Sequence, residues 1–486
     1  MPNNFIMLIN SKPFRSNFIY TTSIFLPSIF GLLITPFFAH TLSKDDVGLL
    51  YLLTTQTQAL AIFALFGMET YFIRSSFENN SDQHQTKLIS ILIVAFSAIF
   101  FLILALVFLN IDLLARIYGI SNKSNVIIYS SFFLIPLESL YGFVLAVLRV
   151  KKKYRLLFWT ECIRLSIYVI GLYIFMHQLD LDIYGRNLSA LASLSLLIFY
   201  PIFWIKSRKS FRLDLALTKQ VVNFAKYWIP STFILTFMPL FDRAFILYFL
   251  DKKSVASFSI AFSLAGVCRL LGAGLTRYCE PFIFSENPRA ITTRSMNLLE
   301  VSFVRSITYA TSIAIILIPL VYKLVMPSDY HDDLLLCSLI IIAAISTYLN
   351  QFSSSRIKAL YQSRILLMIH FCSLLLKFTV AVPLISNYGL IGYAIACVLE
   401  GVIYFFAYRY FDPHNKMDRN SMVYFETSVV LLSSIYLQSI VETWINLKVV
   451  EGISFLFLFV FSILSFYKLI QSLLVLLHMP QTDLRN

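Results

Sequence analysis

Ionisable side chains that lie inside long apolar stretches are the residues of this sequence most able to do chemistry. A charge in an apolar environment is costly to retain, so each is expected to face a partner or a water-filled cavity. The embedded residues are Glu138, Glu161, Arg164, Asp242, Arg243, Arg269, Arg277, Glu280, Lys377, Glu400 and Glu426. The cations among them could hold an anion, and the carboxylates could hold a proton or a sodium ion.

The embedded cations are candidates for binding phosphate, because the planar Arg fork can hold phosphate oxygens in a bidentate manner. Arg269 and Lys377 are the strongest candidates, since each lies deep in its apolar stretch with no carboxylate at helical spacing. Three further candidates are Arg164, Arg243 and Arg277. Arg164 also has a structural alternative, because Glu161 precedes it by three positions and could pair with it on one helix face.

Three embedded carboxylates are candidates for ion coupling. Glu138 and Glu400 are central in their apolar stretches and have no opposite charge three or four positions away. Asp242 is the third, although it adjoins Arg243, and two neighbouring helix positions point in different directions, so at most one is expected to face a cavity. The structural alternative for Glu138 and Glu400 is a neutral, hydrogen-bonded carboxyl that holds two helices together. The sequence leaves these two interpretations open.

Metal, disulfide and nucleotide chemistry have no signature in the sequence. The six cysteines lie in apolar stretches without a CxxC pair, and the seven histidines show neither HxxxH nor HExxH spacing. A GxxxxGK[ST] phosphate loop is also absent from the sequence. We therefore expect no metal, no cofactor and no catalytic residues.

Composition places these charges in a polytopic membrane protein. Hydrophobic residues make up 58% of the 486 residues and charged residues only 13%, about half the usual share in soluble domains. Runs of about 20 apolar residues, the length needed to cross a bilayer, predict about fourteen helical spans. The predicted spans are 17–39, 48–73, 88–110, 125–148, 156–176, 188–205, 227–249, 255–279, 306–326, 334–352, 365–386, 388–408, 421–440 and 452–478.

The distribution of Lys and Arg predicts the orientation of these spans. Basic residues concentrate in alternate inter-span segments, which are cytoplasmic by the positive-inside rule. Both termini are then cytoplasmic, as are the segments 74–87, 149–156, 206–226 and 409–420. The net charge of +13 follows mainly from this topology, so nucleic-acid binding is not expected.

An internal repeat divides the predicted spans into two six-helix lobes. The stretch from Leu42 to Tyr51 aligns without gaps with Leu250 to Ser259, and Ile183-Tyr184-Gly185 aligns with Asn387-Tyr388-Gly389. Equivalents six spans apart have the same orientation, which is a parallel repeat about an axis along the membrane normal. We predict an N-terminal lobe at 1–206, a C-terminal lobe at 207–409 and two extra helices at 410–486.

Several of these motifs resemble one known family. They are the 42–48 stretch LSKDDVG with Gly67 and Arg74, the 148–154 stretch LRVKKKY, and AKYWIP at 225–230 followed by DRAFI at 242–246. In order and spacing they are similar to the polysaccharide flippases of the Wzx type, within the multidrug/oligosaccharidyl-lipid/polysaccharide exporter superfamily. Val47 departs from the aromatic residue common at its position. The resemblance covers the first twelve predicted spans.

The resemblance implies a function, a location and partners. It implies transfer of a polyprenyl-pyrophosphate-linked glycan, such as an O-antigen repeat unit, to the periplasmic leaflet of a bacterial inner membrane. The expected partners are that glycan and membrane lipid, with a proton or sodium as candidate coupling ion and polysaccharide polymerase or assembly proteins as candidate partners. Two alternatives remain open: a glycan polymerase or ligase, disfavoured by the short predicted loops, and a drug or cation antiporter, disfavoured by Arg269 and Lys377.

Overall fold

The structure is a computed structural model that describes most of the chain. The described residues are 12–64, 71–72, 75–76, 81–118, 125–151, 153–195, 214–266, 272, 294–359, 363–411, 421–447, 464–465, 467–468 and 471. Throughout these ranges the regular elements are helices and no strand occurs, as the composition predicts.

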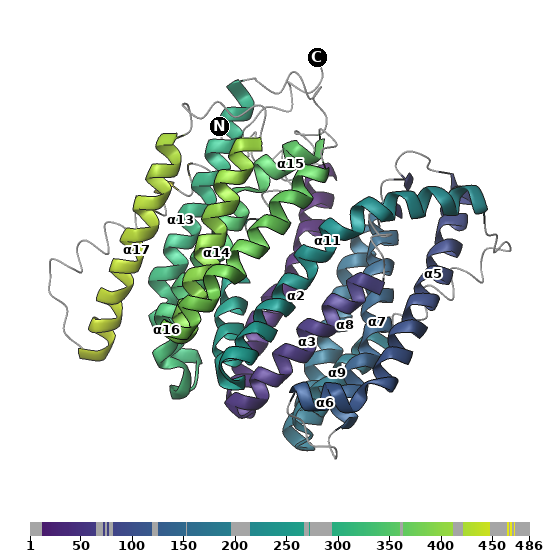
Figure 1. Cartoon of the computed structure of the whole chain (residues 1–486), viewed down its shortest axis with the longest axis horizontal. Helices are drawn as coiled ribbons and strands as arrows, with labels where there is room; N and C mark the ends of the chain where they lie inside the picture. Colours follow the sequence, from purple (N-terminus) through teal and green to yellow (C-terminus); the bar gives the residue numbers. More distant parts are fainter. Residues whose placement is uncertain are drawn as a thin grey trace. The chain divides into compact units, whose positions relative to one another are not determined.

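The helices form two compact units, which are coloured along the chain in Figure 1. Unit 1 comprises residues 1–33 and 41–245, and unit 2 comprises residues 34–40 and 246–486. The first helices are α2 (Lys12–Thr41), α3 (Lys44–Ala64), α5 (Asp82–Leu109), α6 (Ile111–Tyr118), α7 (Asn125–Val150), α8 (Tyr154–Leu172), the π-helix η2 (Tyr173–Gln178), α9 (Asp182–Ser195) and α11 (Leu215–Phe249). A helix over 252–266 follows, then α13 (Arg294–Val325), the 3-10 helix η4 (Ser328–Asp333), α14 (Leu334–Leu349), α15 (Gln351–Ala359), α16 (Ser363–Phe411) and α17 (Ser421–Leu447).

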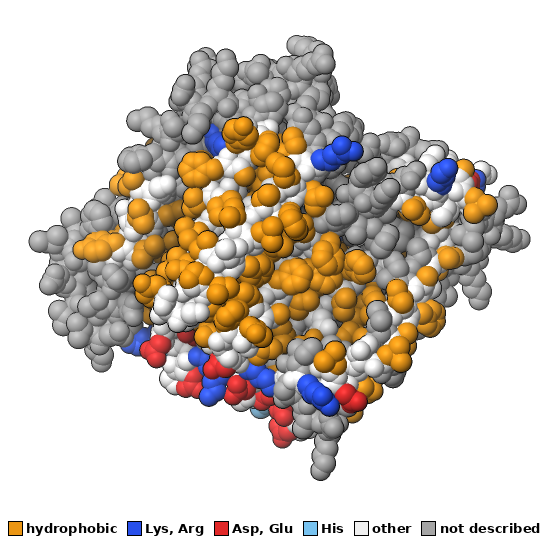
Figure 2. Space-filling model, in the orientation of Figure 1, with side chains coloured by type: hydrophobic (Ala, Val, Ile, Leu, Met, Phe, Trp, Pro, Cys, Tyr) orange, Lys and Arg blue, Asp and Glu red, His pale blue; other side chains and the backbone are white. Residues whose placement is uncertain are grey.

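The described helices have the length and hydropathy of membrane spans. Six stretches among the described residues are long and apolar enough to cross a bilayer: Lys44–Ala64, Val126–Val150, Tyr154–Gln178, Glu300–Val325, Ser328–Ser355 and Arg364–Phe411. Hydrophobic side chains also dominate the face drawn in Figure 2, where charged side chains gather mainly at its margin. The chain is therefore a multi-pass membrane protein, and the count of fourteen spans stays a prediction.

Three segments predicted to lie between spans contain helix. Helix α11 begins at Leu215 and α13 at Arg294, well before the spans predicted at 227 and 306. Asp214 stabilises the early start of α11, because its carboxylate accepts from the backbone N–H groups of Ala216 (3.1 Å) and Leu217 (3.2 Å). The third case is α6, an amphipathic helix with Asp112 and Arg116 among apolar residues, in the segment after position 110.

The first repeat anchor has the same helix cap in both of its copies. Ser43 accepts from the Asp46 N–H (3.2 Å) at the start of α3, and Asp251 accepts from the Ser254 N–H (2.7 Å) at the start of helix 252–266. Ser43 and Asp251 are aligned residues, and a short polar side chain at this position satisfies an otherwise unpaired helix N–H group. The aligned residues Ser43 and Asp251 therefore cap a helix N-terminus in both copies.

Small polar side chains join the helices of unit 1. Helix α7 packs against α3 and α9, and α8 packs against α9. The Ser139 hydroxyl on α7 donates to the Ala61 carbonyl on α3 (2.9 Å), and the Asn187 amide on α9 donates to the hydroxyls of Ser130 (2.8 Å) and Ser131 (2.9 Å). Such residues let helices approach closely and satisfy their polar groups in an apolar surrounding.

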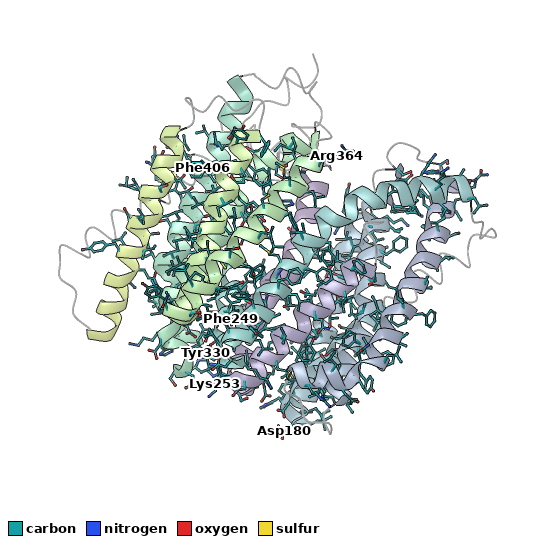
Figure 3. All side chains as sticks on the ribbon, viewed as in Figure 1. Asp180, Phe249, Lys253, Tyr330, Arg364 and Phe406 are labelled. Atoms are coloured by element: carbon teal, nitrogen blue, oxygen red, sulfur yellow. The ribbon has the colours of Figure 1, made fainter. Side chains whose placement is uncertain are left out.

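Unit 2 is built on the packing of α13 against α17 and of α14 against α16. Helix α16 contains a sharp break at Gly389 (φ 58°, ψ −138°), so it is two helices, as the span boundary predicted after residue 386 requires. Lys253 and Tyr330 lie near one end of this unit and Arg364 and Phe406 near the other (Figure 3).

The glycines of the second repeat anchor have different roles. Gly389 is needed for a positive φ, whereas a Cβ on Gly185 would lie 2.8 Å from the Phe175 carbonyl oxygen. In unit 2 a comparable close approach to a backbone carbonyl occurs at Gly392, where a Cβ would clash with the Leu384 carbonyl oxygen. By their contacts, Gly392 is the counterpart of Gly185.

Candidate functional site

Three embedded charges of unit 1, Glu138, Glu161 and Arg164, lie where α7 and α8 meet. The Arg164 guanidinium donates to the Glu161 carboxylate at 3.2 Å, so the pairing predicted from their spacing is confirmed. The guanidinium also lies 4.6 Å from the centre of the Tyr141 ring, a cation–π arrangement that fixes its plane. Glu138 is partly exposed, and the positive charges of Arg164 and Arg186 act on it. This cluster therefore combines a held cation with a largely buried carboxylate.

The Asp242–Arg243 pair lies in α11 of unit 1. Both side chains are buried, and the Arg243 guanidinium donates to the Pro239 carbonyl of its own helix at 2.8 Å. Both side chains are therefore enclosed by the fold, although two neighbouring helix positions point in different directions.

Two candidates that are far apart in the sequence form one ion pair in unit 2. The Lys377 ammonium lies 3.0 Å from the Glu400 carboxylate, across the break at Gly389, and both side chains are buried. The lack of a carboxylate near Lys377 in the sequence was therefore a wrong guide to its surroundings. Glu400 supplies the partner because the two arms of α16 fold back on each other.

Aromatic and hydroxyl side chains extend this ion pair along α16. The Lys377 ammonium lies 5.6 Å from the centre of the Tyr393 ring, and Tyr404 hydrogen-bonds Glu400. Further along, His370 Nε2 lies 2.8 Å from the Tyr408 hydroxyl, which also hydrogen-bonds Ser354 of α15. A buried polar column thus runs from Lys377 toward the end of α16.

Accessibility separates the three predicted cations that the structure describes. The Arg164 side chain is 14% exposed, whereas Lys377 is 2% and Arg243 3% exposed. An incoming anion could reach Arg164 without breaking the fold, while Lys377 would first have to leave Glu400. Arg269 and Arg277 lie outside the described residues.

Sequence reasoning missed the aromatic partners of these charges. Tyr141, Tyr393, Tyr404 and Tyr408 were unremarkable among 27 tyrosines, and only the fold shows which of them contact a charge. Arg186 fell between two predicted spans, although it lies near the start of α9, the helix that packs on α7 and α8. Tyrosines four positions apart, as at 404 and 408, were the available signal.

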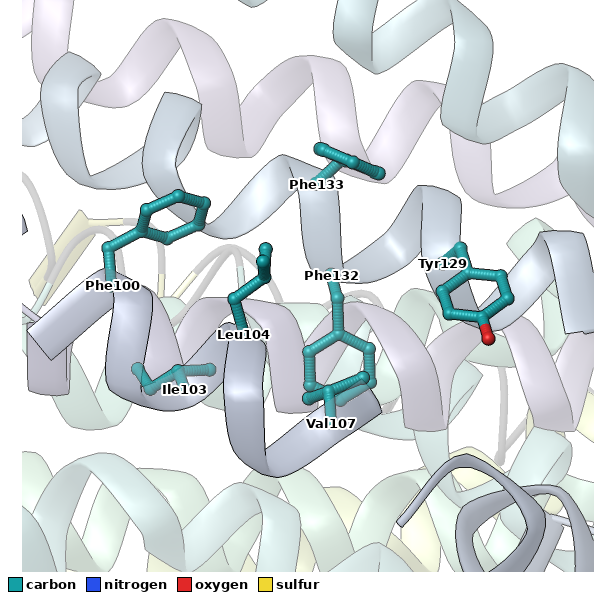
Figure 4. Close-up of a pocket in the computed structure, with 7 residues that line it drawn as sticks. All are labelled: Phe100, Ile103, Leu104, Val107, Tyr129, Phe132 and Phe133. Carbon is teal, nitrogen blue, oxygen red and sulfur yellow. The ribbon is translucent and has the colours of Figure 1, made fainter. Parts of the chain in front are cut away.

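The described residues also contain a small pocket, between α5 and α7 (Figure 4). It is lined by Phe100, Ile103, Leu104, Val107, Tyr129, Phe132 and Phe133. Only Tyr129 brings a polar atom, so the pocket suits an apolar group rather than a charged one. It is separate from the charged cluster at Arg164.

The fold is similar to that of solved membrane transporters. An inward-facing multidrug resistance MATE family transporter of the MOP superfamily matches with a TM-score of 0.63 at 14% identity, over 83% of this chain and 95% of that one. The lipid II flippase MurJ in an inward closed conformation also has a TM-score of 0.63, at 16% identity, over 96% of this chain and all of that one. The Vibrio cholerae MATE transporter VcmN follows at 0.57 and 14% identity, over 82% and 95% of the two chains.

These likenesses and the apolar helices define a multi-pass membrane protein with the fold of the MOP transporters. Residues 14–273, more than half of the chain, match the family described as polysaccharide biosynthesis protein. The chain belongs to this family, as its sequence motifs predicted. No curated protein matches the sequence.

Proposed function

We propose that this chain is a flippase for a polyprenyl-pyrophosphate-linked oligosaccharide, working by alternating access of two lobes. One observation carries the proposal: a member of the polysaccharide biosynthesis family has, along almost its whole length, the fold of a lipid II flippase. The family supplies the class of substrate and the fold supplies the means of moving it. An O-antigen unit and a bacterial inner membrane are the specific forms of this proposal.

Arg164 is the proposed first contact of the pyrophosphate. Its side chain is partly exposed (14%), its guanidinium lies over the Tyr141 ring, and only part of its donor set is used on Glu161. A phosphate oxygen can therefore bind the remaining N–H groups in the fixed plane. Arg269, Arg277, Arg243 and Lys377 remain proposed contacts for other steps of the transfer.

Glu138 is the proposed coupling carboxylate of unit 1. It is largely buried and shares the field of Arg164, so a proton or sodium ion on Glu138 and an anion on Arg164 would favour one another. In unit 2, Glu400 is the proposed counterpart, because neutralising it would free the ammonium of Lys377. Asp242 is retained as a third candidate.

The flippase proposal is tested by deleting the gene in its host. Completed lipid-linked repeat units should then accumulate on the cytoplasmic leaflet, where an impermeant lectin reaches them only in inside-out vesicles. Single units exposed on the outside would instead favour the polymerase alternative. The absence of any glycan change, together with altered drug resistance, would favour a drug exporter, an alternative supported by the equal TM-scores of the MATE transporter and MurJ.

The proposed pyrophosphate contact is tested at Arg164 in the complemented strain. Arg164→Gln should reduce surface glycan strongly, and Arg164→Lys should retain part of it, because the charge survives while the bidentate fork is lost. Tyr141→Phe is the matched control, since it keeps the ring beneath the guanidinium and removes only the hydroxyl. Full glycan with Arg164→Gln at normal abundance would remove Arg164 from the site.

The proposed topology is tested by cysteine labelling in a cysteine-free background. Cysteines at Asn80 and Asn415 should resist an impermeant thiol reagent in intact cells, whereas those at Asp182 and Asp332 should react. Labelling at Asn80 from outside would contradict the orientation, including the cytoplasmic termini.

A further inference from the structure

A cluster of charges in unit 2 joins three helical segments at Glu426. Arg305 on α13 donates from Nε (3.2 Å) and Nη2 (2.9 Å) to one carboxylate oxygen of Glu426 on α17. The other oxygen accepts from the Lys468 ammonium (3.1 Å) and from the Tyr309 hydroxyl. Two cations thus share one carboxylate.

The cluster has a surplus of positive charge that remains accessible. Arg305 and Lys468 against Glu426 leave one net positive charge, and the two cationic side chains are 45% and 47% exposed. Arg305 uses two of its five N–H donors on Glu426. The exposed side of the cluster therefore offers both charge and donors to an anion.

The exposed surface beside the cluster is apolar. Val429, Leu432 and Tyr436 lie together on the face of α17 that adjoins Glu426, and each is at least 45% exposed. Ten residues of helix from Glu426 to Tyr436 span about 15 Å, half of a hydrocarbon core of about 30 Å. Leu464 and Tyr467 expose further apolar surface next to Lys468. A cationic end and an apolar stripe one leaflet long match the two parts of a phospholipid.

We propose that Arg305 and Lys468 bind the phosphate of an anionic phospholipid, whose acyl chains lie along the Val429–Tyr436 stripe of α17. In the predicted topology the leaflet is the cytoplasmic one, because the cluster lies near the start of the apolar stretch Glu300–Val325 and near the start of α17, which follows the predicted cytoplasmic segment 409–420. The site is distinct from the Arg164 cluster and does not depend on the flippase proposal.

A purely structural role would give these residues different properties. A charge cluster that only joins helices (a helix staple) is most stable when its charges balance and are shielded from water. The cluster at Glu426 is instead unbalanced and half exposed. Helices α13 and α17 are also joined independently, by a buried contact of 3.2 Å between the hydroxyls of Thr308 and Thr427. The two roles predict opposite effects for Glu426→Gln: a lipid site gains positive charge, and a staple loses its acceptor.

The test is native mass spectrometry of the purified full chain titrated with phosphatidylglycerol or phosphatidylcholine. We expect preferential retention of phosphatidylglycerol, lowered about fivefold by Arg305→Gln or by Lys468→Gln and raised by Glu426→Gln, since one basic residue near anionic lipid contributes about 1 kcal/mol. Arg305→Lys keeps the positive charge and should retain the lipid. If Glu426→Gln does not fold, the comparison of Arg305→Lys with Arg305→Gln still tests the proposal. The matched control is Lys87→Gln, which removes a cation of similar exposure (41%) that is balanced by a single carboxylate.

Four results would overturn the proposal, and the first three concern retention of phosphatidylglycerol. They are unchanged retention in both cation variants, retention lowered by Glu426→Gln as much as by them, and displacement of the lipid by inorganic pyrophosphate alone. The second result would assign the cluster to a helix staple and the third to a water-borne phosphate. Binding of geranylgeranyl pyrophosphate but not of phosphatidylglycerol would also contradict it and assign the site to the transported lipid.

Discussion

Unit 1 and unit 2 both place ionisable side chains among apolar helices, yet they neutralise them by different means. In unit 1, Arg164 pairs with Glu161 one turn away on its own helix and remains partly exposed. In unit 2, Lys377 pairs with Glu400 across the break at Gly389, and both are buried. The first pair needs only a helix, whereas the second needs the fold. An accessible cation and a locked ion pair are therefore suited to different tasks, receiving an anion and holding or switching a conformation.

The largest expected difference between the two ion pairs is the loss of stability when one member of the pair is removed. Glu400→Gln and Lys377→Gln should each destabilise the protein by about 3–5 kcal/mol, because each leaves a buried charge without its partner. Glu161→Gln should cost only about 1 kcal/mol, because Arg164 can turn toward solvent. Thermal unfolding in detergent measures both effects.

A double variant is the control for this prediction. Lys377→Gln combined with Glu400→Gln removes both charges and should recover a large part of the stability lost in either single variant. If the two single effects simply added, the Lys377–Glu400 contact would not be the source of the loss.

The glycines provide a second and smaller way to sharpen the comparison. Gly389→Ala should destabilise unit 2 by about 1–3 kcal/mol, because a Cβ disfavours positive φ. Gly185→Ala should also destabilise, through contact with the Phe175 carbonyl in unit 1. Gly31→Ala on α2 is the matched control, since no atom lies within 4 Å of its Cβ position, and it should be neutral or stabilising. Equal unfolding temperatures for the Gly389→Ala and Gly31→Ala variants would contradict the prediction.

The same difference explains what the sequence could predict. Glu161 and Arg164 were recognisable as a pair because helical spacing places them together. The break near Gly389 was also predictable, since an apolar stretch of nearly 50 residues is too long for one span. The partner of Lys377 was not, because it depends on how closely two arms of α16 pack after that break.

The cluster at Glu426 shows a further limit of sequence reasoning. Glu426 was recognised as a charge inside an apolar stretch, and Lys468 lies inside the last predicted span, but no rule of spacing joins them. Arg305 was assigned to a loop, because the start of α13 was placed too late. Contacts between residues of one helix can be predicted from their spacing in the sequence. Contacts between helices depend on how the helices pack, which the spacing of residues does not show.

The smallest expected effect concerns the exposed ion pair Lys87–Asp214 of unit 1. Removing it tests how much an exposed ion pair contributes to the stability of this unit. The Lys87 ammonium lies 2.9 Å from Asp214, and this hydrogen bond, with help from the Leu217 N–H, lowers the pKa of the Asp214 carboxyl. A carboxylate with a lowered pKa stabilises the fold above its unfolded pKa of about 3.9, and that contribution is lost as the pH falls through the lower folded value. Asp214→Asn keeps an oxygen that can cap α11 but carries no charge. The wild type should therefore unfold at a slightly higher temperature than this variant at pH 7, and the difference should vanish toward pH 3 and at high salt. A difference that persists at pH 3 would mean that the cap, rather than the charge, is what Asp214 contributes.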